Sequence, residues 1–234
     1  MADDAKPPVQ APLCGQTDLA GFRDQSQQLL AHQVAPDAVQ WLVQAAALAD
    51  LYAEPLSPNA SRPRAVARAA TSIVPASFLR LCESVVLHRD PERFALLYRL
   101  LWRLVHEPAL RNDPVDADMM RAQHMAHAVR RDIHKMKAYV RFVPVAEPGQ
   151  AQPLQVAWFE PSHHVVEVAA PWFAKRHAQQ HWVIFTPERC VRWDGQRLAY
   201  APGLPRDAVP AAEGDARAWL ACIDRAFRPA TAAA

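Results

Sequence analysis

Residues 128–142, AVRRDIHKMKAYVRF, decide the fold, because the helical spacing of apolar residues ends there and an alternating spacing begins. Apolar residues recur there at helical spacing, which predicts a buried stripe of Val129, Ile133, Met136 and Val140. Basic residues occupy the adjacent stripe: Arg130, His134, Lys137 and Arg141. We therefore expect one face of this helix to pack against a core and the next face to remain open to a ligand.

Positive charge is concentrated in the same segment. The whole chain carries a formal net charge of +2, whereas six basic residues and one acid between Arg121 and Arg141 give a local charge of +5. Such a patch indicates an anionic partner, and nucleic acid is the first candidate. The alternative is a solvated face, because acids near a helix N-terminus and bases near its C-terminus each interact favourably with the helix dipole, by about 0.3–1 kcal/mol.

The residues before this helix are expected to form further helices. Capping residues and helical spacing place them at residues 17–33, 36–49, 75–88 and from Asp90 onward. Four arginines lie away from the apolar stripe of the last of these helices and are predicted either to extend the basic surface or to be solvated: Arg89, Arg93, Arg99 and Arg103.

Proline-rich stretches predict the domain limits. We expect a flexible tail at residues 1–16, an N-terminal helical segment at 17–53, a linker at 54–64, an α+β core domain at 65–228 and a second flexible tail at 229–234.

The hydrophobic period changes to two after the basic helix, which predicts strands at residues 139–145, 154–159, 182–185, 189–193 and 197–200. Asp194 and Gly195 predict a hairpin turn between the last two strands. Pro171 is expected to open a helix between the second and third strands, and residues 215–227 a terminal helix. The fold class is therefore α+β, a helical N-terminal half followed by a small, mostly antiparallel sheet with flanking helices.

Composition excludes several classes of protein. The 234 residues, 51% of them hydrophobic, suffice for one large or two small cores. No apolar run approaches the roughly 18–20 residues of a membrane span, so we expect a cytoplasmic protein without membrane contact. The four cysteines are far apart and form no C-x-x-C pair, and we expect no metal or cofactor. A glycine-rich phosphate loop and a G-x-S-x-G elbow are both missing from the sequence.

Several motifs carry a resemblance, and they occur in this order: His88 to Pro91, Leu97 to Leu101, Val129 to Met136, Trp158 to Pro161, His163-His164, Ala170-Pro171, Thr186-Pro187 and Trp193 to Gly195. With them the chain resembles a bacterial family of probable DNA metabolism proteins over residues 18–229, most specifically over residues 88–203. Members stand alone, lie beside a radical-SAM protein of DNA repair or modification, or are fused to a uracil-DNA glycosylase domain. The resemblance implies a pathway and leaves the reaction open.

Two sets of residues are candidates for a site. Acid–base chemistry is the weaker prediction and would use Glu160, His163, His164 and Glu167. Their spacing matches neither H-E-x-x-H nor H-x-x-E-H, so a structural or phosphate-contacting role is also open. For nucleic-acid binding we expect phosphate contacts from Arg130, Arg131, His134, Lys135, Lys137, Arg141 and Arg192, and base stacking on Trp158, Trp182 and Trp193. Packing in the core is the alternative for each of these tryptophans. Trp172, Lys175, Arg176 and Arg189 are interleaved with them.

The favoured hypothesis is an accessory nucleic-acid-binding protein in DNA repair or modification. DNA is its expected ligand, and a radical-SAM or uracil-DNA glycosylase-type protein is the partner that the resemblance implies. An enzyme acting on DNA or a nucleotide through a His/Glu site, and a protein-binding adaptor, remain the alternatives.

Overall fold

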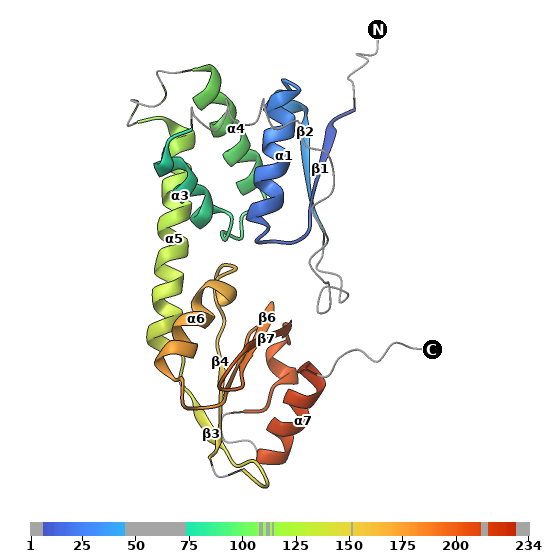
Figure 1. The fold of residues 1–234 in the computed structure, drawn as a ribbon, viewed down its shortest axis with the longest axis vertical. Coiled ribbons are helices and arrows are strands. Elements are labelled where there is room, and N and C mark those ends of the chain that lie inside the picture. The colour runs from blue at the N-terminus through green and yellow to red at the C-terminus, as the bar shows by residue number, and fades with distance from the viewer. Residues whose placement is uncertain are drawn as a thin grey trace. The chain divides into compact units, whose positions relative to one another are not determined.

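The computed structural model describes residues 7–44, 74–107, 110, 113, 115–150, 152–211 and 215–227. The chain divides into two compact units, Met1–Arg130 and Arg131–Ala234 (Figure 1). Helix α5 (Ala117–Tyr139) contains the point of division. The predicted core domain at residues 65–228 is thus shared between the two units. Helices together with one parallel and one mixed sheet confirm the α+β class.

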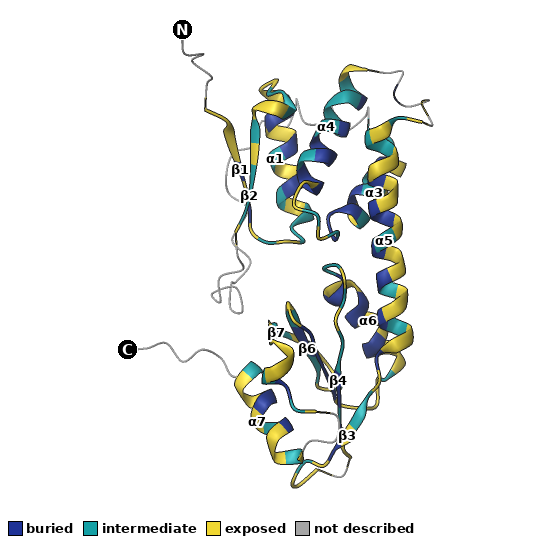
Figure 2. Ribbon diagram, turned by 180° about the vertical axis from the view of Figure 1, so that it is seen from behind, coloured by how far each residue is buried: buried dark blue, intermediate teal, exposed yellow. Residues whose placement is uncertain are grey.

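The first unit combines a two-stranded parallel sheet with helices. Its elements are β1 (Val9–Leu13), α1 (Leu19–Ala31), a 3-10 turn at Pro36–Ala38, β2 (Val39–Val43), α3 (Ala76–Val85), α4 (Arg93–His106) and the first part of α5. The buried faces of α1 and α4 carry the core of this unit (Figure 2). Phe22 of α1, Trp41 of β2 and Phe94 of α4 meet there with ring centroids 5.1–6.1 Å apart.

Two expectations about this unit were wrong. Residues 9–13, expected in a flexible tail, form β1 and pair in parallel with β2. Residues 36–43, expected to open a second helix, form the 3-10 turn and β2 instead, because Val39, Trp41 and Val43 alternate at a period of two and pack on the core. The remainder of that predicted helix, the linker at 54–64 and the tail at 229–234 lie outside the described residues.

The arginines of α4 do not form the basic surface that their spacing suggested. Arg93 is only 1% exposed. Arg99 forms a two-pronged ion pair with Asp118, with both N–O distances 2.9 Å, and Arg103 lies 2.8 Å from Asp116. The guanidinium of Arg99 lowers the pKa of the Asp118 carboxyl, which keeps the pair charged. The charges of Arg99 and Arg103 are therefore neutralised within the unit.

The second unit is a five-stranded mixed sheet with helices on its faces. The strands are β3 (Val143–Val145), β4 (Leu154–Trp158), β5 (Trp182–Phe185), β6 (Arg189–Trp193) and β7 (Leu198–Pro202), in the order β3-β4-β5-β6-β7. Three of the four pairings are antiparallel, and the parallel pair β4–β5 is connected through α6 (Val166–Arg176). The mostly antiparallel sheet is confirmed, and the terminal helix is α7 (Ala216–Phe227).

Opposite faces of this sheet are covered by α6 and α7. Along β5, Trp182 contacts Phe173 of α6, whereas Phe185 contacts Trp219 of α7. Because side chains of a strand alternate between faces, these contacts put the two helices on opposite sides. All four residues of β5 are buried, as expected for a strand covered on both faces.

Local signals placed most boundaries of the second unit correctly. The predicted hairpin joins Trp193 to Leu198, Asp194 accepts hydrogen bonds from the backbone of Gln196 and Arg197, and Gly195 has a φ of +90°. Two boundaries differ by four or more residues. Residue 139 is helical rather than extended, so the first strand begins at Val143, and α6 begins at Val166, five residues before Pro171.

Candidate nucleic-acid interface

The second half of α5 has the two faces that its sequence predicted. Val129, Met136 and Val140 are buried and Ile133 is half-buried, which confirms the packing stripe. The one acid of the stretch, Asp132, is buried, and its carboxylate accepts a hydrogen bond of 2.8 Å from the backbone N–H of His163. The negative charge of this segment is thus directed inward, and the exposed face of the helix is basic.

The predicted phosphate-contacting residues of α5 are accessible. Arg131, His134, Lys135 and Arg141 are exposed, Lys137 is half-buried, and Arg130, the last residue of the first unit, is exposed. Within the described ranges, no carboxylate pairs with any of these side chains. Arg141 donates 2.6 Å to the carbonyl of Ala138, close to where the helix ends. This face of α5 therefore differs from α4, whose Arg99 and Arg103 are paired with carboxylates, and it is the candidate contact surface.

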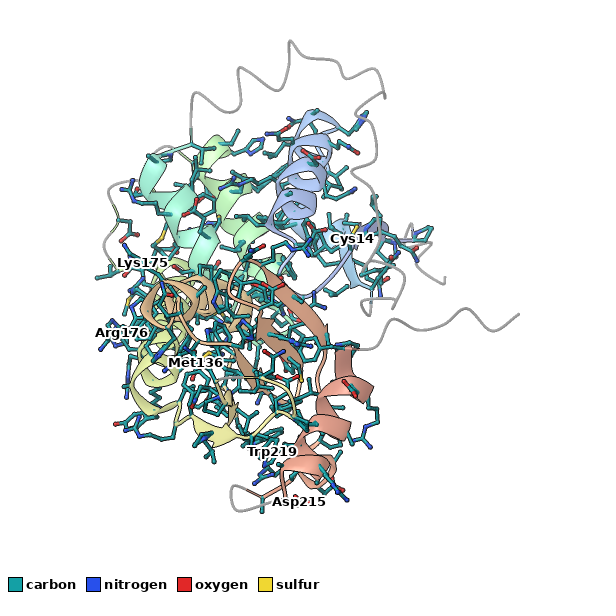
Figure 3. The ribbon with its side chains drawn as sticks, turned by 60° about the horizontal axis from the view of Figure 1, so that its bottom comes forward. Cys14, Met136, Lys175, Arg176, Asp215 and Trp219 are labelled. Atoms are coloured by element: carbon teal, nitrogen blue, oxygen red, sulfur yellow. The ribbon has the colours of Figure 1, made fainter. Side chains whose placement is uncertain are left out.

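Helix α6 adds to this basic face. Its buried side consists of Val166, Ala169, Ala170, Phe173 and Ala174. Its other side carries Trp172, Lys175 and Arg176, which are exposed. Lys137 of α5 lies with its Nζ 5.6 Å from the ring centroid of Trp172, so the basic sides of the two helices adjoin. Figure 3 shows Lys175 and Arg176 at the end of α6, with Met136 of α5 nearby.

The three tryptophans that were predicted to stack on bases differ in burial. Trp182 is fully buried and contacts Phe142 and Phe173, so its proposed role in stacking was wrong. Trp158 is half-buried, donates 3.1 Å to Glu160 and lies below the guanidinium of Arg206. Trp193 and Arg192 are also half-buried, and the indole of Trp193 lies 3.4 Å from the carbonyl of Ala178.

The sequence analysis placed Trp172 among the interleaved aromatic and basic residues but did not select it for base stacking. Starting the helix at Pro171 hid the face on which this side chain falls. With α6 beginning at Val166, the spacing of Val168, Trp172, Lys175 and Arg176 predicts one exposed helical face. That spacing could have identified the exposed face of α6 that carries Trp172.

The histidines and glutamates form pairs other than the expected ones. His164 and Glu188 lie 2.6 Å apart, and Glu167 lies 3.0 Å from Arg189. His163 and His164 precede α6, which begins at Val166, so the helical spacing expected of them with Glu167 does not apply. A His–carboxylate pair is able to hold a proton acceptor in place, and it is also an ordinary ion pair. Among the described residues, no group of three His, Cys, Asp or Glu side chains could hold a metal ion.

A separate open groove lies in the first unit. It is lined by His88, Asp90, Val115, Ala117, Met120, Arg121, His124, Met125 and Ala128. An ion pair of 3.0 Å joins Arg121 to Asp90 at its edge, and Val115 and Met120 expose large apolar side chains. None of the predicted acid–base residues lines this groove.

The protein thus consists of a first unit of helices with a two-stranded sheet, and a second α+β unit with a basic face. The chain belongs to the family described as a domain of unknown function, DUF4130, which matches residues 91–218. The match includes α5, α6 and the five-stranded sheet. Comparison with curated proteins and with solved structures gives no match. Of the helices that the structure describes, none has the length and apolar character needed to cross a membrane.

Proposed function

We propose that the protein is an accessory nucleic-acid-binding protein of the bacterial cytoplasm, acting in DNA repair or modification. One observation carries the proposal: the exposed Arg131 and Lys135 and the half-buried Lys137 on α5 have no carboxylate partner among the described residues, whereas Arg99 and Arg103 of α4 are paired. Cations that have no carboxylate partner suit the phosphate backbone of DNA. The resemblance to probable DNA metabolism proteins supports the pathway.

Phosphate contacts of this kind provide affinity without reading sequence. We therefore expect weak binding with little sequence preference. Part of the free energy comes from counterions that the DNA releases, so the logarithm of the affinity falls linearly with the logarithm of the salt concentration. A titration of the full chain with single- and double-stranded oligonucleotides tests this. If about four phosphates are neutralised on a single strand, the slope is roughly −3. An absence of binding at low salt would refute the proposal.

An accessory role requires a partner that performs the chemistry. The proposed partner is a radical-SAM or uracil-DNA glycosylase-type protein, and the helical first unit is its proposed contact surface. The groove in that unit exposes Val115 and Met120, which are large apolar side chains and favour a protein contact. Such a contact would leave the basic face of the second unit available for DNA.

Replacing both Val115 and Met120 by aspartate should abolish co-purification of such a partner and leave DNA affinity within about twofold. Both side chains are exposed, so the substitutions place charge in the contact without opening a core. The control is a variant with Arg131, Lys135 and Lys137 replaced by alanine, which should retain the partner. If the first variant retains the partner and the control loses it, the partner contacts the basic face and not the first unit. Turnover of DNA by the isolated protein would contradict the accessory role.

A further inference from the structure

Trp172 differs from every other tryptophan of the chain. All seven lie within the described residues, and Trp172 is the one that is exposed, at 38% of its surface. Trp182 and Trp219 are buried in the second unit, and Trp158 and Trp193 donate hydrogen bonds from their indoles. A large exposed apolar surface carries a cost in water that a contact with a ligand removes.

The core of the second unit does not require this ring. The adjacent Phe173 fills the space under α6, where it contacts Trp182 and Phe142. Trp172 touches Phe173 edge to face, with ring centroids 5.0 Å apart and an interplanar angle of 89°, so its indole is held against a fixed neighbour. Val168, one turn earlier on the same face, is 50% exposed. The ring is therefore positioned at the surface rather than packed beneath it.

Cations surround this exposed ring. Lys137 lies above it at 5.6 Å, and Lys175 and Arg176 follow it by three and four residues, which puts them on the same side of α6. In the described part of the chain, none of these three cations pairs with a carboxylate. An aromatic side chain flanked by unpaired cations is the arrangement with which proteins bind single-stranded nucleic acid, since the ring stacks on a base and the cations contact its phosphates.

We propose that Trp172 stacks on an unpaired base, so that the ligand of the basic face is single-stranded DNA. This proposal rests on the proposed function and deepens it. In a duplex the faces of the bases are covered by their neighbours, so the ring gains no stacking contact unless a base is extruded, whereas a single strand presents a base directly. Lys137, Lys175 and Arg176 hold the phosphates on either side of that base.

The test compares wild type with Trp172→Ala and Trp172→Phe, using a labelled oligothymidine and a duplex of the same length. Trp172→Ala should weaken binding to the single strand about tenfold, which lies within the range for one lost stacking contact. Its salt slope should stay that of wild type, because the phosphate contacts remain. Trp172→Phe should retain most of the affinity, and duplex binding should change by less than twofold in both variants.

Tyr139→Ala is the matched control. Tyr139 is 66% exposed and follows Lys137 by two residues, so it faces away from Trp172 on α5. Its removal should leave single-strand affinity unchanged. Tryptophan fluorescence gives a second readout: the oligothymidine should quench a part of the emission that Trp172→Phe lacks, and this difference does not depend on measured affinity.

The outcomes separate the two proposals. Suppose that wild type binds DNA. If Trp172→Ala then binds oligothymidine as tightly as wild type, or loses affinity for the duplex and the single strand equally, the stacking proposal is overturned while the proposed function stands. If wild type binds neither the oligothymidine nor the duplex, the proposed function fails as well. An acidic polyglutamate of equal charge that binds as tightly as oligothymidine, with the same loss in Trp172→Ala, would show that the surface takes an acidic peptide.

Discussion

Replacing Arg93 by methionine is expected to lower the free energy of unfolding by about 3–5 kcal/mol. The guanidinium of Arg93 is buried and donates to three backbone carbonyls, those of Val86 at 2.9 Å, Asp90 at 3.0 Å and Gln16 at 2.7 Å. Methionine fills much of the same volume but has no donor. Each buried carbonyl left without a partner costs about 1–3 kcal/mol.

The measurement is urea unfolding of the full chain followed by far-UV circular dichroism. Arg80→Met is the matched control, because Arg80 lies on the exposed side of α3 and its replacement should change stability by less than about 0.5 kcal/mol. A loss of less than 1 kcal/mol in Arg93→Met would show that the network does not connect Gln16 to α4 in the way its distances indicate.

Replacing Arg131, Lys135 and Lys137 together by alanine is expected to remove most of the affinity for DNA. If each cation neutralises one phosphate of a single strand, their loss makes the salt slope shallower by about 2. A change of that size corresponds to roughly hundredfold weaker binding at 0.1 M salt. Arg131 and Lys135 are exposed and Lys137 is half-buried, so the protein should remain folded.

The control for this variant removes three exposed arginines from other surfaces, Arg80, Arg197 and Arg217. Both variants lose three positive charges, so the control accounts for the change in net charge. We expect the control to keep a slope within about 0.5 of wild type. If the two variants lose affinity to the same extent, binding follows overall charge, and α5 is not the contact surface.

Local patterns in the sequence were sufficient for much of the fold. The stripe through Val129 and Met136, the strand at residues 182–185 and the turn at Asp194 each depend on residues close together in the chain, and each was found as predicted. By contrast, β1 forms only because it pairs with β2, some thirty residues away. No local pattern contains that information.

The same reasoning accounts for the errors at the candidate site. Arg93 has the spacing of a surface residue, yet backbone carbonyls from two other segments accept its hydrogen bonds. Trp182 was predicted from its neighbouring cations to stack on bases, but both faces of β5 are covered by helices. Glu188 approaches His164 from a loop 24 residues further along the chain. Each outcome depends on tertiary contacts that spacing does not encode.

Lysine footprinting tests the central claim, that the adjoining faces of α5 and α6 are where DNA binds. Lys135, Lys137 and Lys175 are three of the four lysines in the chain, and Lys6 provides the internal control. Acetylation rates of each lysine are measured by mass spectrometry with and without saturating oligothymidine. The account predicts that the three lysines react several-fold more slowly when DNA is bound, while Lys6 is unaffected. Unchanged rates at all three, in protein shown to be saturated with DNA, would contradict it.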